Sequence, residues 1–152
     1  MVPLEVRRFT RRDLERVVAI ERASFGKDAW RPELFLEYSR VSPELFLIAR
    51  HSRKIAGYSI TRVDWRGAEL ESIAVDPLYR GRGVAQALLR ATISLLRART
   101  LRLMVSTKNE SALRFYERFG FTRVRKVKGY YGSGRDAWRM RLKSRPKQQG
   151  DK

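Results

Sequence analysis

Two glycines alternate with two arginines in residues 80–85, a segment suited to binding an anion. An apolar run ends just before Pro77, and a long amphipathic stretch begins directly after the second glycine. Glycine permits backbone conformations that aim successive N–H groups at one point, and the start of a helix adds roughly half a positive charge. The segment therefore predicts a phosphate-binding turn. Its members are Arg80, Gly81, Arg82, Gly83, Val84 and Ala85.

The spacing of these glycines argues against two common nucleotide sites. It differs from the Gly-x-Gly-x-x-Gly of dinucleotide-binding folds and from the ATP-binding loop that ends in Gly-Lys-Ser/Thr. A Gly-x-Gly pair before a helix also shapes many turns that bind nothing. On these residues alone, a phosphate site and an ordinary turn both stay open.

The composition is strongly basic, with 34 Lys and Arg against 16 Asp and Glu and a net charge of +18 over 152 residues. This excess predicts an anionic partner: nucleic acid, a ribosome surface or a phosphorylated cofactor. A genome rich in arginine would produce the same bias without any function. The chain has no cysteine, which excludes a thiol nucleophile and a thiolate zinc site, and we expect no metal.

The apolar runs are far shorter than the ~20 residues of a membrane-spanning helix. The N-terminus carries several arginines and no apolar core of a signal peptide. We therefore expect a cytoplasmic protein without membrane association.

The first half of the chain predicts short strands and two helices. Strands are expected at residues 4–9, 45–50, 54–63 and 69–75, with a hairpin turn at 51–54. The last three of these strands should form an antiparallel meander. A capping box, Thr10 to Asp13, opens the first helix, on which Glu21 and Arg22 should face solvent, and Pro32 begins the second.

The second half predicts alternating helices and strands. A helix over residues 83–97 should bury one stripe, made of Val84, Leu88, Ala91 and Leu95. A second helix, ended by Gly120, should bury Ala112, Phe115, Tyr116 and Phe119. The strands follow at residues 101–105, 121–127 and 136–142. This order implies a mixed α/β sheet in one domain, residues 1–143, followed by a flexible basic tail, 144–152.

Three segments resemble the GNAT acetyltransferase superfamily, and together they span most of the chain. Residues 80–85 are similar to its motif A, Arg/Gln-x-x-Gly-x-Gly/Ala, and residues 109–121 to its motif B, with Asn, Ala, Tyr and Gly-Phe at matching spacing. Residues 129–140 resemble the closing hairpin of the protein Nα-acetyltransferases, which include the ribosomal-protein alanine acetyltransferases. The resemblance implies a GNAT fold with a mixed sheet of six to seven strands and about four helices.

The resemblance also implies acetyl-CoA as cosubstrate, in a split between the strands at 69–75 and 101–106. The pyrophosphate would sit on backbone N–H groups of residues 81–85, and the pantetheine would pair with the backbone of Ile73, Ala74 and Val75. Asn109 would hydrogen-bond the cofactor. One N–H of that strand would polarise the thioester carbonyl, a contribution of ~3 kcal/mol in other oxyanion sites.

By the same resemblance, Tyr116 occupies the position of the acid that protonates the leaving thiolate. Its periodicity alone favours a core aromatic on the face of Ala112, Phe115 and Phe119. Relatives among the ribosomal-protein enzymes carry a Glu, the usual proton acceptor, where this chain has Met104. Glu71 could accept the proton through water instead, or could simply be a solvent-facing partner of an arginine.

The acceptor is expected to be an amine, most readily the N-terminal α-amine of a protein. At pH 7 an α-amine is roughly 14% neutral and a lysine amine only about 0.04%, so a site with a weak base suits the former. Phe25, Trp30, Tyr130 and Tyr131 could wall a peptide groove, although aromatics in such places often close the core.

Two other functions stay open from the sequence. One is acetylation of a small amine, such as a polyamine or an aminoglycoside. The other is a non-catalytic module that associates with the ribosome or nucleic acid through the basic surface. The oligomeric state is left open.

Overall fold

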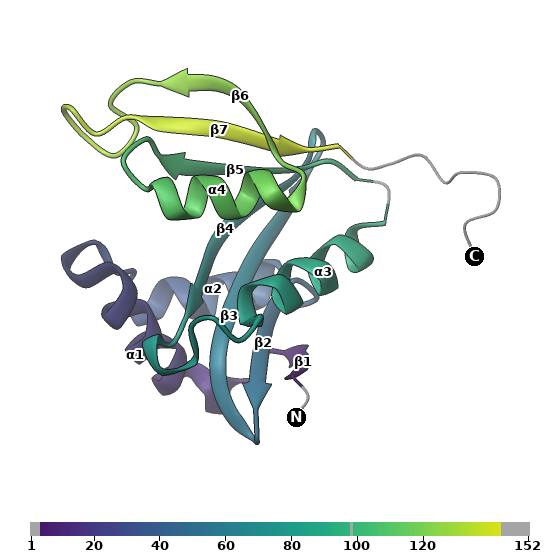
Figure 1. Ribbon diagram of the computed structural model, residues 1–152. Helices are drawn as coiled ribbons and strands as arrows, with labels where there is room; N and C mark the ends of the chain where they lie inside the picture. Colours follow the sequence, from purple (N-terminus) through teal and green to yellow (C-terminus); the bar gives the residue numbers. More distant parts are fainter. Residues whose placement is uncertain (1–3, 98, 144–152) are drawn as a thin grey trace. The chain divides into compact units, whose positions relative to one another are not determined.

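The structure is a computed structural model that describes residues 4–97 and 99–143 (Figure 1). Seven strands pair in the order β1-β2-β3-β4-β5-β7-β6. The strands are β1 (Leu4–Arg8), β2 (Phe46–His51), β3 (Lys54–Asp64), β4 (Gly67–Val75), β5 (Leu101–Ser106), β6 (Thr122–Val127) and β7 (Ala137–Leu142). The α-helices are α1 (Leu14–Phe25), α2 (Pro32–Val41), α3 (Val84–Leu96) and α4 (Glu110–Phe119). Every element predicted from the sequence is present, and the mixed sheet is confirmed.

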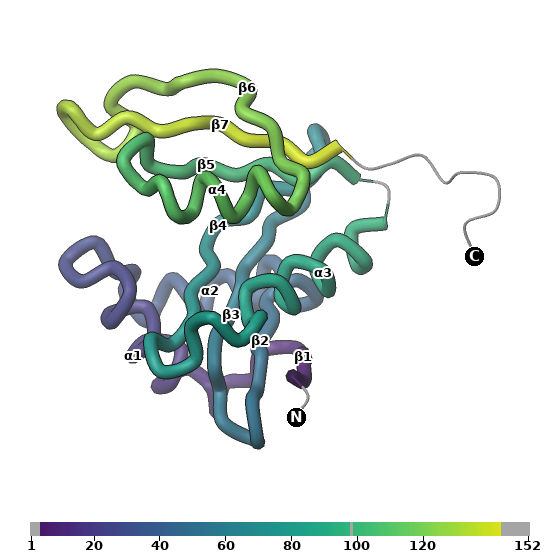
Figure 2. The backbone as a smooth tube through the Cα atoms, in the orientation of Figure 1, coloured from purple at the N-terminus to yellow at the C-terminus, as the bar shows by residue number. Residues whose placement is uncertain are grey.

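The chain divides into two compact units. Among the described residues, the first unit holds 4–62 and 71–95, and the second holds 63–70, 96–97 and 99–143. Strands β3 and β4 contribute residues to both units. Figure 2 traces the backbone of these strands. The single domain over residues 1–143 stays a prediction, and the predicted tail lies outside the described residues.

Strand β2 organises the first unit because it is buried on both faces. Phe46 and Ile48 belong to a core cluster with residues of α1 and α2. The alternate residues, Leu47 and Ala49, belong to another cluster with residues of α3. A strand with period-two side chains serves two layers at once where consecutive residues are apolar, which explains the continuous apolar run from Phe46 to Ala49.

Local signals set the ends of the elements in this unit. The Asp13 carboxylate accepts a hydrogen bond from Thr10 N at 2.7 Å, so the predicted capping box forms, ahead of a short 3-10 turn that leads into α1. Strands β1, β2 and β3 pair antiparallel. The predicted hairpin turn has Ser52 and Arg53 at φ angles of 50° and 69°.

The buried stripe of α3 differs from the predicted one. Leu88, Thr92 and Leu96 are buried, whereas Leu95 is 48% exposed and Ala91 is half-buried. The Thr92 hydroxyl donates to the Leu88 carbonyl at 2.8 Å, which satisfies its polar group inside the helix. A sequence reading that treats threonine as polar skips this position, and the rest of the stripe is then displaced.

The second unit contains the parallel step of the sheet. Strand β5 pairs parallel with β4 at Ala68–Leu101 and Glu69–Arg102, and it pairs antiparallel with β7 along its whole length. Strand β6 pairs antiparallel with β7. The described helices are too short or too polar to cross a membrane.

Helix α4 follows β5 and has the caps that the sequence predicts. Asn109 accepts from the Ala112 N–H at 3.2 Å, and Gly120 ends the helix in the left-handed region at φ 119°. The buried face is Leu113 and Tyr116, while Phe115 is only half-buried. The predicted face is therefore rotated, because Leu113 takes the central position.

Candidate active site

The turn before α3 has the backbone conformation that its glycines suggest. Gly81 and Gly83 have φ angles of 76° and 78°, in the region that side chains rarely adopt. A Cβ at Gly81 would meet nothing within 4 Å, and one at Gly83 would come no closer than 3.9 Å to Gln86. Glycine is therefore needed at both positions for its left-handed backbone and not for space.

The N–H groups of this turn are available to a ligand. The first helical bond runs from Ala87 N to Gly83 O at 3.0 Å. Within the described residues, the N–H groups of residues 81–85 donate no hydrogen bond. Arg82 lies over the Tyr79 ring at 5.6 Å, and Arg80 is exposed. The turn thus presents a cluster of backbone donors and two cations, the arrangement that binds phosphate.

Asp76 fixes the start of this turn, a role that the sequence analysis missed. Its buried carboxylate accepts from Leu78 N at 2.9 Å and forms an ion pair with Arg16 of α1. Its N–H donates to Ala56 O at 2.7 Å. The Asp-Pro pair was the available signal, because an N-cap residue followed by proline starts a helical turn.

Gly57 of β3 was also missed, and it lets α3 begin close to the sheet. A Cβ there would lie 2.8 Å from Ala74 O and 2.9 Å from Val84 Cγ1. A glycine inside a predicted strand is the usual signal of a close approach. Gly57 therefore determines how near the donor turn lies to β4.

The β4 residues expected to bind pantetheine adjoin this turn. Ile73 and Val75 pack against the cluster that contains Val84, and Ala74 is buried in the cluster of α1 and α2. All three come after the part of β4 that pairs with β5. The first unit therefore brings residues 73–75 and the donor turn together.

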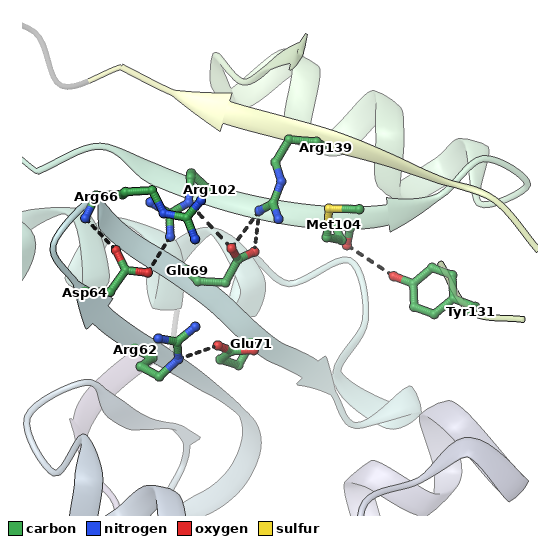
Figure 3. A network of polar contacts seen from close by, with 9 residues as sticks. All are labelled: Arg62, Asp64, Arg66, Glu69, Glu71, Arg102, Met104, Tyr131 and Arg139. Carbon is green, nitrogen blue, oxygen red and sulfur yellow. Dashed lines mark hydrogen bonds and ion pairs between the residues drawn. The ribbon is translucent and has the colours of Figure 1, made fainter. Parts of the chain in front are cut away.

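Glu71, the candidate base, is held by an arginine of the neighbouring strand. Arg62 Nε donates to Glu71 Oε1 at 2.9 Å (Figure 3). Burial raises the pKa of the nearby Tyr38 phenol, and the charge of Glu71 raises it further. Glu71 is thus ion-paired, and its side chain keeps 20% of its surface exposed.

The second unit holds a denser network around Glu69, two residues earlier on β4. Arg139 Nη1 lies 2.6 and 2.8 Å from the two Glu69 oxygens, and Arg102 Nε lies at 3.5 Å. Arg102 also donates to Asp64 at 2.8 Å (Figure 3). Both oxygens of Glu69 therefore contact guanidinium groups, and Glu71 is the carboxylate with fewer such contacts.

Tyr116 is buried in an aromatic cluster of the second unit. Its ring centroid lies 5.3 Å from that of Phe115 and 5.4 Å from that of Phe121. In the described part of the chain its hydroxyl makes no hydrogen bond. Burial raises the pKa of Tyr116, and the Tyr131 hydroxyl raises it further, so the phenol keeps its proton.

The loop after β6 presents two tyrosines. Tyr130 and Tyr131 are 51% and 39% exposed, with their rings edge to face at 4.8 Å. Tyr131 Oη donates to Met104 O at 3.4 Å (Figure 3). Asp136 accepts from Gly129 N at 2.9 Å and closes the loop. The second unit therefore brings Tyr131 near both Tyr116 and Met104.

Asn109 has a free donor group besides its capping role. Its Oδ1 accepts from Ala112 N and from Ser111 Oγ, both at 3.2 Å. Its amide NH2 has no partner within residues 4–97 and 99–143. Asn109 can therefore cap α4 and donate to a ligand at the same time.

The two aromatic residues of the first helical hairpin have different surroundings. Phe25 is 42% exposed at the end of α1. The Trp30 ring is half-buried against the core and stacks on Tyr38 at 5.3 Å. Glu21, which was expected to face solvent, is instead 1% exposed. That expectation was wrong because Glu21 accepts hydrogen bonds from residues remote in sequence, which periodicity does not reveal.

The mixed sheet and the glycine turn at the start of α3 define the class of the protein. The model of the acetyltransferase (GNAT) family matches residues 13–121. The chain therefore belongs to that family and is an N-acetyltransferase.

Individual relatives agree with this assignment. The chain is 34% identical to N-alpha-acetyltransferase RimI of Mycobacterium tuberculosis over 148 residues, 93% of this chain and 94% of that protein. It resembles the crystal structure of Ard1 from Thermoplasma volcanium with a TM-score of 0.88 and 30% identity, over 95% and 100% of the chains. The ribosomal-protein-S18-alanine N-acetyltransferase from Escherichia coli matches with a TM-score of 0.81 and 27% identity, over 97% and 98%. These likenesses confirm the predicted fold.

Proposed function

We propose that the protein transfers the acetyl group of acetyl-CoA to the N-terminal α-amine of a protein. The observation that carries this proposal is the turn at residues 81–85, whose N–H groups have no acceptor in the described residues. Relatives named as N-alpha-acetyltransferases support the acceptor class.

The donor turn is the proposed site of the CoA pyrophosphate. The N–H groups of residues 81–85 supply hydrogen bonds, and the start of α3 supplies a favourable dipole. Arg80 and Arg82 add positive charge at the exposed edge. No metal is needed for this binding, because backbone donors and guanidinium groups already complement a diphosphate.

The pantetheine arm is proposed to pair with the backbone of residues 73–75. These residues adjoin the donor turn and follow the part of β4 that pairs with β5. An N–H from this segment would polarise the thioester carbonyl. The free amide group of Asn109 is proposed to donate to the same cosubstrate.

Tyr116 is proposed as the proton donor. As the amine attacks the thioester carbon, the new C–N bond forms and the C–S bond breaks, leaving a thiolate. The leaving group is a thiolate, and a free cysteine thiol has a pKa near 8.5 in water, whereas burial raises the pKa of the Tyr116 phenol above its ordinary value and keeps it protonated. A protonated phenol without a protein partner can therefore donate to the developing sulfur anion.

Glu71 is proposed to accept the ammonium proton through water. Met104 offers no proton acceptor, and Glu69 is committed to Arg139 and Arg102. Glu71 has a single described guanidinium contact, at 2.9 Å from Arg62. An α-amine needs only modest help, because roughly one in seven molecules is already neutral at pH 7.

The residues proposed to contact the acceptor peptide are Phe25, Trp30, Tyr130 and Tyr131. Three of the four are well exposed, and Trp30 presents a half-buried ring held by Tyr38. These side chains offer large apolar area with little conformational freedom to lose on binding.

An acetylation assay with matched acceptors tests this proposal. Peptides with a free α-amine are compared with N-terminally blocked peptides that contain lysine, and with spermidine, while release of the CoA thiol is followed. We expect acetylation of the free α-amine only. Faster acetylation of the blocked lysine peptide or of spermidine would contradict the proposed acceptor.

A further inference from the structure

Glu21 of α1 is a buried carboxylate without a cation. The residue as a whole is only 1% exposed. None of the described Lys, Arg or His residues forms an ion pair with it. Burying a charge without a counter-charge is costly, so we expect both oxygens of this carboxylate to accept hydrogen bonds.

Those donors come from two different parts of the first unit. Trp30 N lies 2.8 Å from Glu21 Oε2, so the backbone of the loop between α1 and α2 is fixed by this carboxylate. The Tyr58 hydroxyl of β3 donates to Glu21 Oε1. Burial and the charge of Glu21 raise the pKa of Tyr58, which keeps that proton in place.

The chain of contacts continues to β4. Tyr58 Oη lies 3.2 Å from Oγ of Ser72, and Ser72 immediately precedes Ile73 in β4. Glu21 and Tyr58 thus connect the loop that ends at Trp30 with the strand proposed to hold pantetheine. All four contact residues lie in the first unit.

The ring of Trp30 also holds the loop, through contacts with two aromatic residues of α2. The Trp30 ring stacks on Tyr38 at 5.3 Å and lies 5.5 Å from Phe35. Between Phe25 and Trp30 the backbone turns through a short 3-10 segment, Gly26–Asp28, in which no residue is buried. Glu21 is therefore a buried polar anchor, through Trp30 N–H, for an exposed loop that has an aromatic residue at each end.

We propose that Glu21 is a positioning residue for the acceptor: it fixes the loop from Phe25 to Trp30 relative to β4, so that a bound amine is held in register with the thioester. This inference rests on the proposed function. Glu21 itself touches neither substrate, because both of its oxygens are occupied and its surface is covered.

The test uses three variants of the full chain. Glu21→Leu removes the acceptor for Trp30 N–H and replaces it with an apolar side chain of similar size, so the core stays filled. Glu21→Gln can accept from Trp30 N–H and donate to Tyr58 Oη, so it is the conservative rescue. Glu15→Leu, at an exposed position of the same helix, is the matched control.

For Glu21→Leu we expect the KM for the acceptor peptide to rise about tenfold. The acetyl-CoA affinity and the kcat at saturating peptide should stay within about twofold of wild type. Glu21→Gln should return the peptide KM to within about threefold, and Glu15→Leu should leave it unchanged. Exchange of the Trp30 amide hydrogen, measured by NMR, should accelerate in Glu21→Leu alone.

Two results would overturn the positioning role. One is an unchanged peptide KM in Glu21→Leu. The other is a loss in which kcat, peptide KM and acetyl-CoA affinity all worsen together with the melting temperature. If Glu21→Leu does not fold, Tyr58→Phe serves instead: it keeps the ring, breaks the link to Ser72, and must also raise the peptide KM selectively. A wild-type protein that acetylates no peptide would instead overturn the proposed function, and the Trp30 exchange rates would still report on the anchor.

Discussion

The donor turn at residues 81–85 and the buried carboxylate of Glu21 are opposite solutions to the same problem of pairing polar groups. The turn has backbone donors with no acceptor in the described residues, and its residues 81–83 are exposed. Each carboxylate oxygen of Glu21 accepts a hydrogen bond from one donor, and the residue is buried. Groups left unpaired at a surface are available to a ligand, whereas groups paired inside fix geometry.

This difference assigns distinct consequences to the two regions. A change in the turn should act on the binding of the cosubstrate. A change at Glu21 should act on the acceptor and leave the cosubstrate untouched.

The largest effect is expected from Gly83→Asp. The new side chain forces a strained φ and places a negative charge where the diphosphate is proposed to bind, so acetyl-CoA affinity should fall by at least 100-fold in calorimetry. Gly26→Asp is the matched control, because Gly26 also has a positive φ, 54°, with nothing within 4 Å of its Cβ. An affinity that survives Gly83→Asp would contradict the site.

Tyr116→Phe should lower kcat at least tenfold while the acetyl-CoA affinity changes by less than about twofold. The hydroxyl has no partner in the described residues, so its removal should not lower the melting temperature. Unchanged turnover in Tyr116→Phe would remove this residue from the proton transfer.

A smaller, pH-dependent effect is expected at Glu71. Glu71→Gln should lower kcat/KM about fivefold at pH 7, because fewer acceptor amines are neutral there. The deficit should shrink above about pH 8, where the free α-amine, with a pKa near 7.8, loses its proton to solvent.

Glu69→Gln sharpens that prediction as a control from the same strand. It breaks the contacts to Arg139 and Arg102, so it should lower the melting temperature without changing the shape of the pH profile. A pH-dependent deficit in Glu69→Gln, with none in Glu71→Gln, would reverse the assignment of the two carboxylates.

The smallest effect is expected from Gly57→Ala. Its Cβ would lie under 3 Å from Ala74 O and Val84 Cγ1, so the start of α3 must shift. Overpacking of this kind costs about 1–3 kcal/mol of stability. Acetyl-CoA affinity should fall about threefold, and a variant with unchanged affinity and melting temperature would show that the close approach is dispensable.

Local signals made much of the fold predictable. The capping box at Thr10, the proline at the start of α2 and Gly120 at the end of α4 each act within a few residues. The donor turn is predictable for the same reason, because glycine itself permits the positive φ angles that Gly81 and Gly83 adopt.

The features that the sequence did not predict depend on the hydrogen-bond partners of buried polar side chains. The burial of Glu21 depends on Tyr58, which lies 37 positions away, and that of Asp76 depends on Arg16, 60 positions away. Thr92 shifted the stripe of α3 because its hydroxyl finds an acceptor inside its own helix. A buried polar residue is explained by its partner, and a single sequence does not identify that partner.

A crystal structure of the protein with CoA would show whether the donor turn binds the diphosphate. We expect diphosphate oxygens within about 3.2 Å of backbone nitrogens among residues 81–85. A structure in which CoA is bound elsewhere, while these nitrogens contact only water, would contradict it.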